Sequence, residues 1–186
     1  RSPLPTGPRY AGAWTGEQLV VVGRAGNVGH AAGYDPSADT WQLLDTAGID
    51  LPAGIPALDV HWTGSRVVAV TTLPLGSGPT AAIFDPSTEE WWTSKPPGFG
   101  SRSAGTATLN GLVYLVSYSQ FTDGTIALDP VVDSWSNRTS LGDLSCEGSP
   151  TVTAFRSSLF VESCNRAVIY EPAAGTFRRV AEQPGY

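Results

Sequence analysis

Methionine is absent from the 186 residues, and lysine occurs once, as Lys95. Cysteine and histidine occur twice each, as Cys146, Cys164, His30 and His61. Charged residues make up 15% of the chain, well below the usual quarter, and no apolar run is long enough for a membrane-spanning helix. The net charge of −6 argues against a nucleic-acid-binding surface, which needs clustered basic residues. We therefore expect no membrane span and no nucleic-acid partner.

The same scarcity limits the chemistry that the chain can perform. His30 and His61 belong to different repeats, and no group of Cys, His and Asp has the spacing of metal ligands. No serine has the His and Asp setting of a catalytic triad. We therefore expect no metal, no cofactor and no catalytic residue in this chain.

Glycine and proline are abundant, with 21 and 15 residues, and hydrophobic residues make up 41%. Runs of β-branched and aromatic residues alternate with Gly, Pro and Asp, which is the pattern of short strands joined by tight turns. No window shows a convincing helical period. The sequence predicts an all-β protein.

A pattern of four parts occurs four times along the chain. It consists of a large apolar residue, an acid, a proline and then an aromatic residue seven positions after the first residue. Its copies are Tyr34-Asp35-Pro36 with Trp41, Phe84-Asp85-Pro86 with Trp91, Leu128-Asp129-Pro130 with Trp135, and Tyr170-Glu171-Pro172 with Phe177. Successive copies start 50, 44 and 42 residues apart, a period in the range of propeller blades.

The residue types in this pattern suit a turn followed by a packed strand. Asp accepts hydrogen bonds from downstream backbone N–H groups, and Pro fixes φ at the second position of a type I turn. Glu171 is longer than Asp, so we expect the fourth turn to be the weakest. The aromatic residues on the flanking strands are large enough to fill the wedge between neighbouring sheets.

Each repeat contains four strand signals, which predict one antiparallel meander per repeat. In the third repeat, Asn110-Gly111 between two apolar runs predicts a type I′ hairpin turn. The repeats cover approximately residues 9–47, 56–96, 102–141 and 147–181.

This meander, with its Asp-Pro turn and its aromatic residue at a fixed offset, resembles the kelch motif over nearly all of residues 9–181. The glycine pair that kelch repeats usually carry after strand 2 is reduced here to Val22-Gly23. The resemblance implies a β-propeller of four four-stranded antiparallel blades. Because kelch propellers usually have six or seven blades, it also implies part of a larger ring. Proline-rich stretches at residues 1–10 and 182–185 look like connectors between repeats, so we expect the chain to be a section of a longer array.

We expect a non-catalytic binding or scaffold module of a secreted or cell-envelope protein, with a protein or carbohydrate partner. In a meander, the loops between strands 2 and 3 share one face with the blade connectors, and these segments vary most here, as binding loops do. The candidate ligand-binding residues on that face are Arg9, Arg24, His30, Arg102, Gln120 and Phe121. By the kelch resemblance, Arg9 and Arg102 would lie at the mouth of a central channel and bind an anionic ligand. Alternatively, they hydrogen-bond carbonyl groups of neighbouring connectors.

Two other functions remain open. The first is the propeller part of a galactose-oxidase-like or other carbohydrate-active enzyme whose catalytic residues lie elsewhere. A copper site of that kind needs a Tyr/Cys cross-link, a second Tyr and two His. The second is a structural subunit whose end blades are covered by blades of the same or another chain, including two copies that close an eight-blade ring.

The two cysteines fall in the fourth repeat. Cys146 lies in the connector that enters it and Cys164 in its 2–3 loop, so both belong to one face of one blade. A bridge would close a loop of 18 residues and stabilise the fold by roughly 3 kcal/mol. Two free thiols are the alternative.

Overall fold

The computed structural model describes residues 2–6, 9–25, 28–47, 49, 51, 57–72, 79–96, 104–117, 124–136, 139–140, 150–163 and 166–180. These residues form sixteen strands and no helix. The predicted all-β class is therefore confirmed. Within these residues, no helix is long and apolar enough to cross a membrane.

The strands form four antiparallel sheets, each built from four consecutive strands in chain order. Sheet 1 contains β1 (Arg9–Trp14), β2 (Leu19–Ala25), β3 (Val28–Asp35) and β4 (Thr40–Leu44). Sheet 2 contains β5 (Ala57–Trp62), β6 (Val67–Thr72), β7 (Thr80–Asp85) and β8 (Glu90–Ser94). Sheet 3 contains β9 (Ala104–Leu109), β10 (Leu112–Ser117), β11 (Gly124–Asp129) and β12 (Ser134–Trp135). Sheet 4 contains β13 (Thr151–Phe155), β14 (Ser158–Ser163), β15 (Arg166–Glu171) and β16 (Thr176–Arg179).

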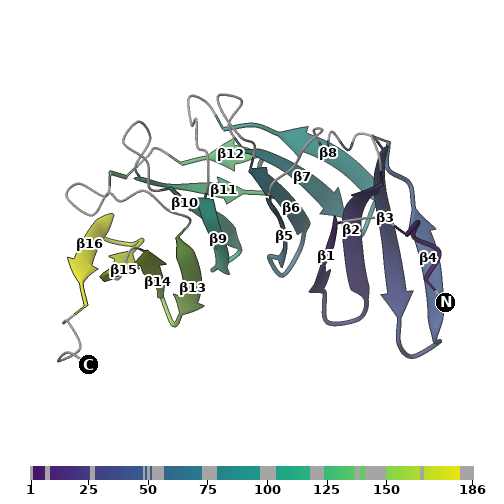
Figure 1. Ribbon diagram of the computed structural model, residues 1–186, viewed down its shortest axis with the longest axis horizontal. Coiled ribbons are helices and arrows are strands. Elements are labelled where there is room, and N and C mark those ends of the chain that lie inside the picture. Colours follow the sequence, from purple (N-terminus) through teal and green to yellow (C-terminus); the bar gives the residue numbers. More distant parts are fainter. Residues whose placement is uncertain are drawn as a thin grey trace.

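The sheets follow one another in chain order along an open arc, with sheets 1 and 4 at its two ends (Figure 1). The first strand of each sheet lies on the concave side of the arc, and the fourth strand lies on the convex side. Neighbouring first strands contact one another, β1 with β5, β5 with β9, and β9 with β13.

The turns between first and second strands form as their residues predict. Thr15 and Thr63 each donate a side-chain hydroxyl to the carbonyl three residues later, at 3.0 and 3.1 Å, and the intervening glycines have positive φ. Asn110 and Gly111 have φ values of 53° and 81°, as a type I′ turn requires.

The recurrent acid organises the turn between the third and fourth strands. Asp35 accepts hydrogen bonds from the N–H and hydroxyl of Ser37, both at 2.7 Å, and Asp85 does the same with Ser87 at 2.9 and 2.7 Å. These bonds hold the pKa of each carboxyl below its ordinary value. In sheet 2, Arg66 adds an ion pair to Asp85 at 2.7 Å.

In the fourth turn the acid, Glu171, makes different contacts. Its carboxylate accepts a hydrogen bond from the Ser158 hydroxyl at 2.7 Å and lies 3.7 Å from Arg178, so its described contacts are to neighbouring strands. The backbone closes this turn as it closes the turn of sheet 2: the N–H of Gly175 donates to the Glu171 carbonyl at 2.9 Å, and the N–H of Glu89 donates to the Asp85 carbonyl at 2.9 Å. Gly175 has a φ of 63° and thus takes the left-handed conformation that glycine adopts without strain.

Each sheet has two faces, which we name by the recurrent pattern. The front face carries the apolar residue of the third strand and the aromatic residue seven positions later, and the back face is the opposite one. In each sheet these two residues are cross-strand partners, namely Tyr34 with Trp41, Phe84 with Trp91, Leu128 with Trp135, and Tyr170 with Phe177.

The front of each later sheet packs against the back of the sheet before it. Phe84 and Trp91 of sheet 2 share a core cluster with Val20 and Val22 of sheet 1. The second junction joins the front of sheet 3 to the back of sheet 2, and the third joins sheets 4 and 3 in the same manner. These three clusters are the hydrophobic core, and burial of their apolar surface is the main stabilising term.

Two junctions also contain a hydrogen bond that involves the front-face aromatic residue. The indole N–H of Trp135 donates to the Ser94 hydroxyl at 2.8 Å. The hydroxyls of Tyr170 and Thr139 lie 3.3 Å apart. Ser94 and Thr139 hold equivalent positions in sheets 2 and 3. Each pairs with the third-strand residue that comes three positions before the recurrent apolar residue.

In sheet 1 this place is taken by Leu44, which pairs with Ala31. Leu44 has no hydroxyl, and the indole nitrogen of Trp91 is buried without a hydrogen-bond partner among the described atoms. The first junction is thus entirely apolar at the point where the other two are hydrogen-bonded.

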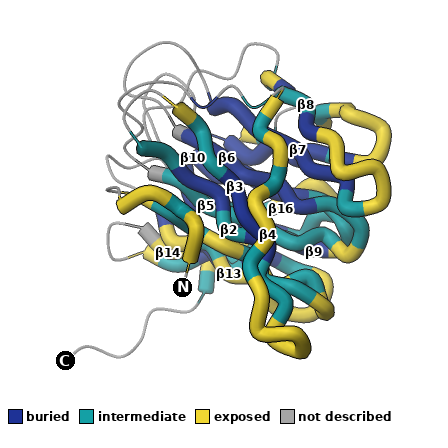
Figure 2. The backbone as a smooth tube through the Cα atoms, turned by 90° about the vertical axis from the view of Figure 1, so that its right-hand side faces the viewer, coloured by how far each residue is buried: buried dark blue, intermediate teal, exposed yellow. Residues whose placement is uncertain are grey.

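The front of sheet 1 has no sheet against it, and Figure 2 views the molecule from this side, with β4 largely exposed. Tyr34 and Trp41 contact each other there at 5.0 Å between ring centroids. Trp14 is 50% exposed and Leu43 is 60% exposed.

The burial of these faces predicts unequal losses from equivalent substitutions. Phe84→Ala, at a side chain that is 1% exposed, should lower the free energy of unfolding by about 3–5 kcal/mol. Tyr34→Ala at the same register position should cost well under half as much, because its face is uncovered. Urea melts in dilute solution test this, and equal losses for the two variants would contradict the packing described above.

Candidate functional site

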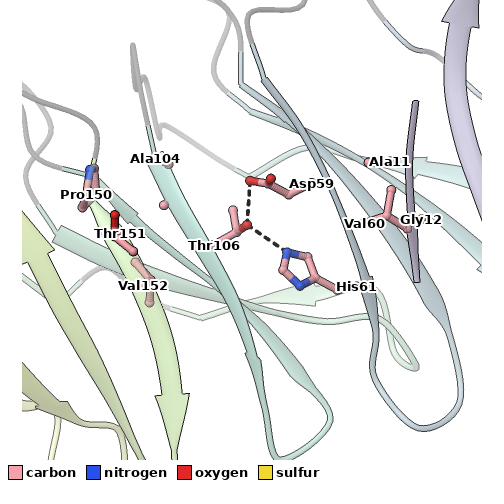
Figure 3. Close-up of a pocket in the computed structure, with 11 residues that line it drawn as sticks. Ala11, Gly12, Asp59, Val60, His61, Ala104, Thr106, Pro150, Thr151 and Val152 are labelled. Carbon is pink, nitrogen blue, oxygen red and sulfur yellow. Dashed lines mark hydrogen bonds between the residues drawn. The ribbon is translucent and has the colours of Figure 1, made fainter. Parts of the chain in front are cut away.

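The four first strands line a cleft of about 430 Å³ on the concave side of the arc (Figure 3). Its walls come from β1, β5, β9, β13 and the residue before β13. The lining residues are Ala11, Gly12, Asp59, Val60, His61, Ala104, Gly105, Thr106, Pro150, Thr151 and Val152. A volume of this size suits a small molecule or a single large side chain.

The cleft runs along the middle of β1 and β5 and begins at the first residues of β9 and β13. Ala104 is the first residue of β9, and Thr151 is the first residue of β13. The chain enters each first strand from the preceding connector, so this part of the cleft is at the connector end.

Gly105 allows β9 and β13 to approach each other closely at the cleft. A Cβ atom at this position would collide with the backbone carbonyl oxygen of Pro150 and would lie 2.7 Å from Cγ2 of Val152. Since backbone cannot move aside as a flexible side chain can, a side chain at residue 105 would push the two strands apart.

A hydrogen-bonded group of three side chains crosses the cleft from β5 to β9. The Thr106 hydroxyl donates to Oδ2 of Asp59 at 2.9 Å. Nε2 of His61 lies 2.8 Å from the same hydroxyl oxygen. A hydroxyl has one proton, and here the carboxylate accepts it, so His61 donates from Nε2 and carries its lone pair on Nδ1. Figure 3 shows the three side chains meeting between the two strands.

Strand alternation explains why Asp59 and His61 point the same way. Leu58, Val60 and Trp62 pack on the core between sheets 1 and 2. Residues two apart in a strand share a face, so Asp59 and His61 point to the opposite side, toward β9.

Partial burial lowers the pKa of His61 from its ordinary value of 6.5, and the Asp59 carboxylate partly offsets this by raising it. His61 is therefore neutral at pH 7. Asp59 has no described ion-pair partner, so the group carries one negative charge. Among the described atoms, the second carboxylate oxygen of Asp59 and Nδ1 of His61 are acceptors with no hydrogen bond. The cleft thus presents acceptors to a ligand that supplies donors.

The residues predicted from the sequence to bind a ligand either lie away from the cleft or fall outside the described residues. Arg9 and Arg24 are cross-strand partners at the connector end of sheet 1. His30 pairs with Gly23, which places it on the front face of sheet 1. None of these three lines the cleft. Arg9 and Arg24 are cross-strand neighbours on the back of sheet 1, and His30 lies in the adjacent row on its front.

Five nominated residues fall outside the described residues. They are Arg102, Gln120, Phe121, Cys146 and Cys164. Their predicted ligand-binding and disulfide roles therefore stay predictions.

Asp59 and Thr106 are not among the residues predicted from the sequence, and His61 is predicted there without a partner. A signal was present, because β5 alternates apolar and polar residues as Leu58-Asp59-Val60-His61-Trp62. Such alternation on an inner strand marks a polar face. Within the described ranges, no three side chains of His, Cys, Asp or Glu gather as metal ligands.

The network predicts how the pKa of His61 responds to its neighbour. Asp59→Asn removes the charge that favours protonated His61, so the pKa of His61 should fall further. Titration of the imidazole Cε1–H signal by NMR measures this. Glu90→Gln, on the exposed end of β8, is the control and should leave the pKa in place. An unchanged or higher pKa in Asp59→Asn would disprove the proposed contact.

The same shift links folding to pH. Because the pKa of His61 is lower in the folded chain than its ordinary 6.5, the unfolded chain binds more protons below that pH. The contribution of His61 to stability should be complete above about pH 6.5 and decline as the pH falls toward the folded pKa. His61→Gln keeps a donor for Thr106 and should flatten this part of the profile in urea melts between pH 7.5 and pH 5. A profile identical to that of the unmodified chain would refute this linkage.

No protein-family model matches the chain, and no curated protein matches it either. The site is therefore interpreted from its own geometry.

Proposed function

We propose that this chain is a non-catalytic binding module, that its four sheets are consecutive blades of a kelch-like β-propeller, and that its ligand occupies the cleft between the first strands. The front-to-back stacking of four meanders and the inward position of all first strands support the propeller arrangement. The recurrent Asp-Pro turn with its front-face aromatic residue supports the kelch resemblance.

The observation that carries the binding role is the acceptor-rich group at Asp59, Thr106 and His61. Asp59 is a half-buried carboxylate without a described cation, in a chain of net charge −6. A positively charged donor would gain both a charge-assisted hydrogen bond and a compensating charge there. We therefore propose that the recognised group is a guanidinium or ammonium of a protein partner.

The order of the three groups supports binding over catalysis. In a catalytic triad, the imidazole lies between the hydroxyl and the carboxylate, so that it can accept the hydroxyl proton. Here the hydroxyl of Thr106 lies between them, and its proton is held by Asp59. His61 donates to this hydroxyl and does not act as its base.

A galactose-oxidase-like copper site does not fit the described residues. Its two histidines would have to meet, but His30 lies on the front of sheet 1, whereas His61 points from β5 toward β9. A secreted or cell-envelope location rests on the predicted bridge between Cys146 and Cys164.

Titration with a blocked Gly-Arg-Gly peptide tests the proposal. Saturable changes should appear in the backbone amide NMR signals of Gly105 and Thr106, and Asp59→Asn should weaken binding by about tenfold or more, since a hydrogen bond to a charged group is lost. The citrulline peptide, which has the same shape without the charge, should bind more weakly, and Glu90→Gln should bind as the unmodified chain does. Equal binding by Asp59→Asn, or saturable changes with glucose and none with the arginine peptide, would overturn it.

A further inference from the structure

Each first strand keeps one edge free, because it is hydrogen-bonded to only one strand of its own sheet. Within the described residues, first strands of different sheets are not hydrogen-bonded neighbours. The free edges lie on the concave side of the arc, where the cleft is (Figure 1). Sheet 3 has another sheet packed on each of its faces. The free edge of β9 is therefore an interior feature of the arc.

The hydrogen bonds of sheet 3 show which backbone groups of β9 point to this free edge. In an antiparallel sheet, the N–H and C=O of one residue point to the same side, and successive residues alternate. Thr125 exchanges both backbone bonds with Thr139, at 2.8 and 2.9 Å. Its neighbour Ile126 therefore bonds to the other side, to Leu115 in β10. Leu115 then cannot bond to Thr106, its partner in β9, so the N–H and C=O of Thr106 point away from β10 and toward the cleft.

The same alternation gives every first strand one such residue at the cleft. The backbone bonds at the first turns of sheets 1 and 2, and that between the outer strands of sheet 4, set the same phase as in sheet 3. The four residues occupy one register row and all line the cleft, and they are Gly12, Val60, Thr106 and Val152. The cleft therefore offers backbone donors and acceptors beside the side-chain acceptors of Asp59 and His61.

Of these four residues, Thr106 is the one whose side chain bonds to a charged group. A strand that pairs with β9 would place the side chain opposite Thr106 on the same face as the Thr106 side chain. That face is turned toward β5, so this side chain would lie beside Asp59 and His61. Side chains opposite Val60 and Val152 would instead face the apolar clusters on which these two valines pack.

We propose that an extended segment of the protein partner adds a strand to the free edge of β9, with an arginine directly opposite Thr106. The backbone N–H of this arginine donates to the Thr106 carbonyl, and its carbonyl accepts from the Thr106 N–H, as in other strand additions. Its guanidinium bonds to Asp59 and has further donors for the open acceptor of His61. This inference rests on the proposed function and narrows its ligand from any cationic group to arginine in an extended chain.

Amide hydrogen exchange measured by NMR tests the backbone pairing. In the free chain, the N–H of Thr106 should exchange quickly, and that of Ala107, which bonds to Tyr114 in β10, should exchange slowly. A saturating amount of the blocked Gly-Arg-Gly peptide should slow exchange at Thr106 by about tenfold or more, well beyond any change at Ala107. Exchange at Thr106 that the bound peptide does not slow would overturn the proposal.

Two N-methylated peptides test the register, because alternate N–H groups of the added strand face β9. A methyl group on the backbone nitrogen of the arginine removes the donor to Thr106 and should weaken binding by about fivefold or more. Sarcosine in place of the second glycine puts the methyl group on the opposite edge, so this matched control should bind as the unmodified peptide does.

The outcomes separate this inference from the proposed function. Equal losses with the two methylated peptides, or no loss with either while Asp59→Asn still weakens binding, would overturn the added strand and leave the binding role of Asp59 in place. An unmodified peptide that does not bind at all would overturn both.

Discussion

The fold depends on one repeated contact, in which the front face of each later sheet lies on the back face of the sheet before it. A four-stranded meander buries too little surface to be stable alone, so each sheet gains its stability from its neighbours. The contact is directional, because each of the three junctions joins a front face to a back face. That direction orders the sheets along the arc, and it leaves one face of each kind at the ends.

Hydrogen bonds add to this contact at two of the three junctions, and among the described residues the first junction forms without one. Ser94 and Thr139 provide a hydroxyl to the aromatic residue of the next sheet, and Leu44 replaces that hydroxyl at the first junction. The indole N–H of Trp91 is buried with no hydrogen-bond partner in the part of the chain that the structure describes, which costs about 1–3 kcal/mol. The first junction offsets this with an almost fully buried stacked pair, Phe84 and Trp91, at 4.7 Å between centroids.

The sheets and turns could be predicted from sequence because they depend on local residues. Asp35 and Asp85 bond to the residue two positions on, and Asn110-Gly111 closes its hairpin by its own backbone preferences. The network at the cleft could not be predicted in this way. Thr106 and Asp59 are 47 residues apart and come from different sheets, so their contact exists only after the sheets stack. No spacing in the chain encodes it.

The same stacking explains why a polar group lies on the concave side. Aromatic residues hold the sheets apart toward the convex side, and the inner strands converge where Gly105, Ala104, Ala11 and Gly12 leave room for backbone. Side chains that point inward from converging strands are half-buried, and half-buried polar groups must bond to one another or to a ligand. Thr106 satisfies one oxygen of Asp59 and one nitrogen of His61. The acceptors that remain are thus a consequence of the packing that forms the arc, and they give the cleft its preference for a donor.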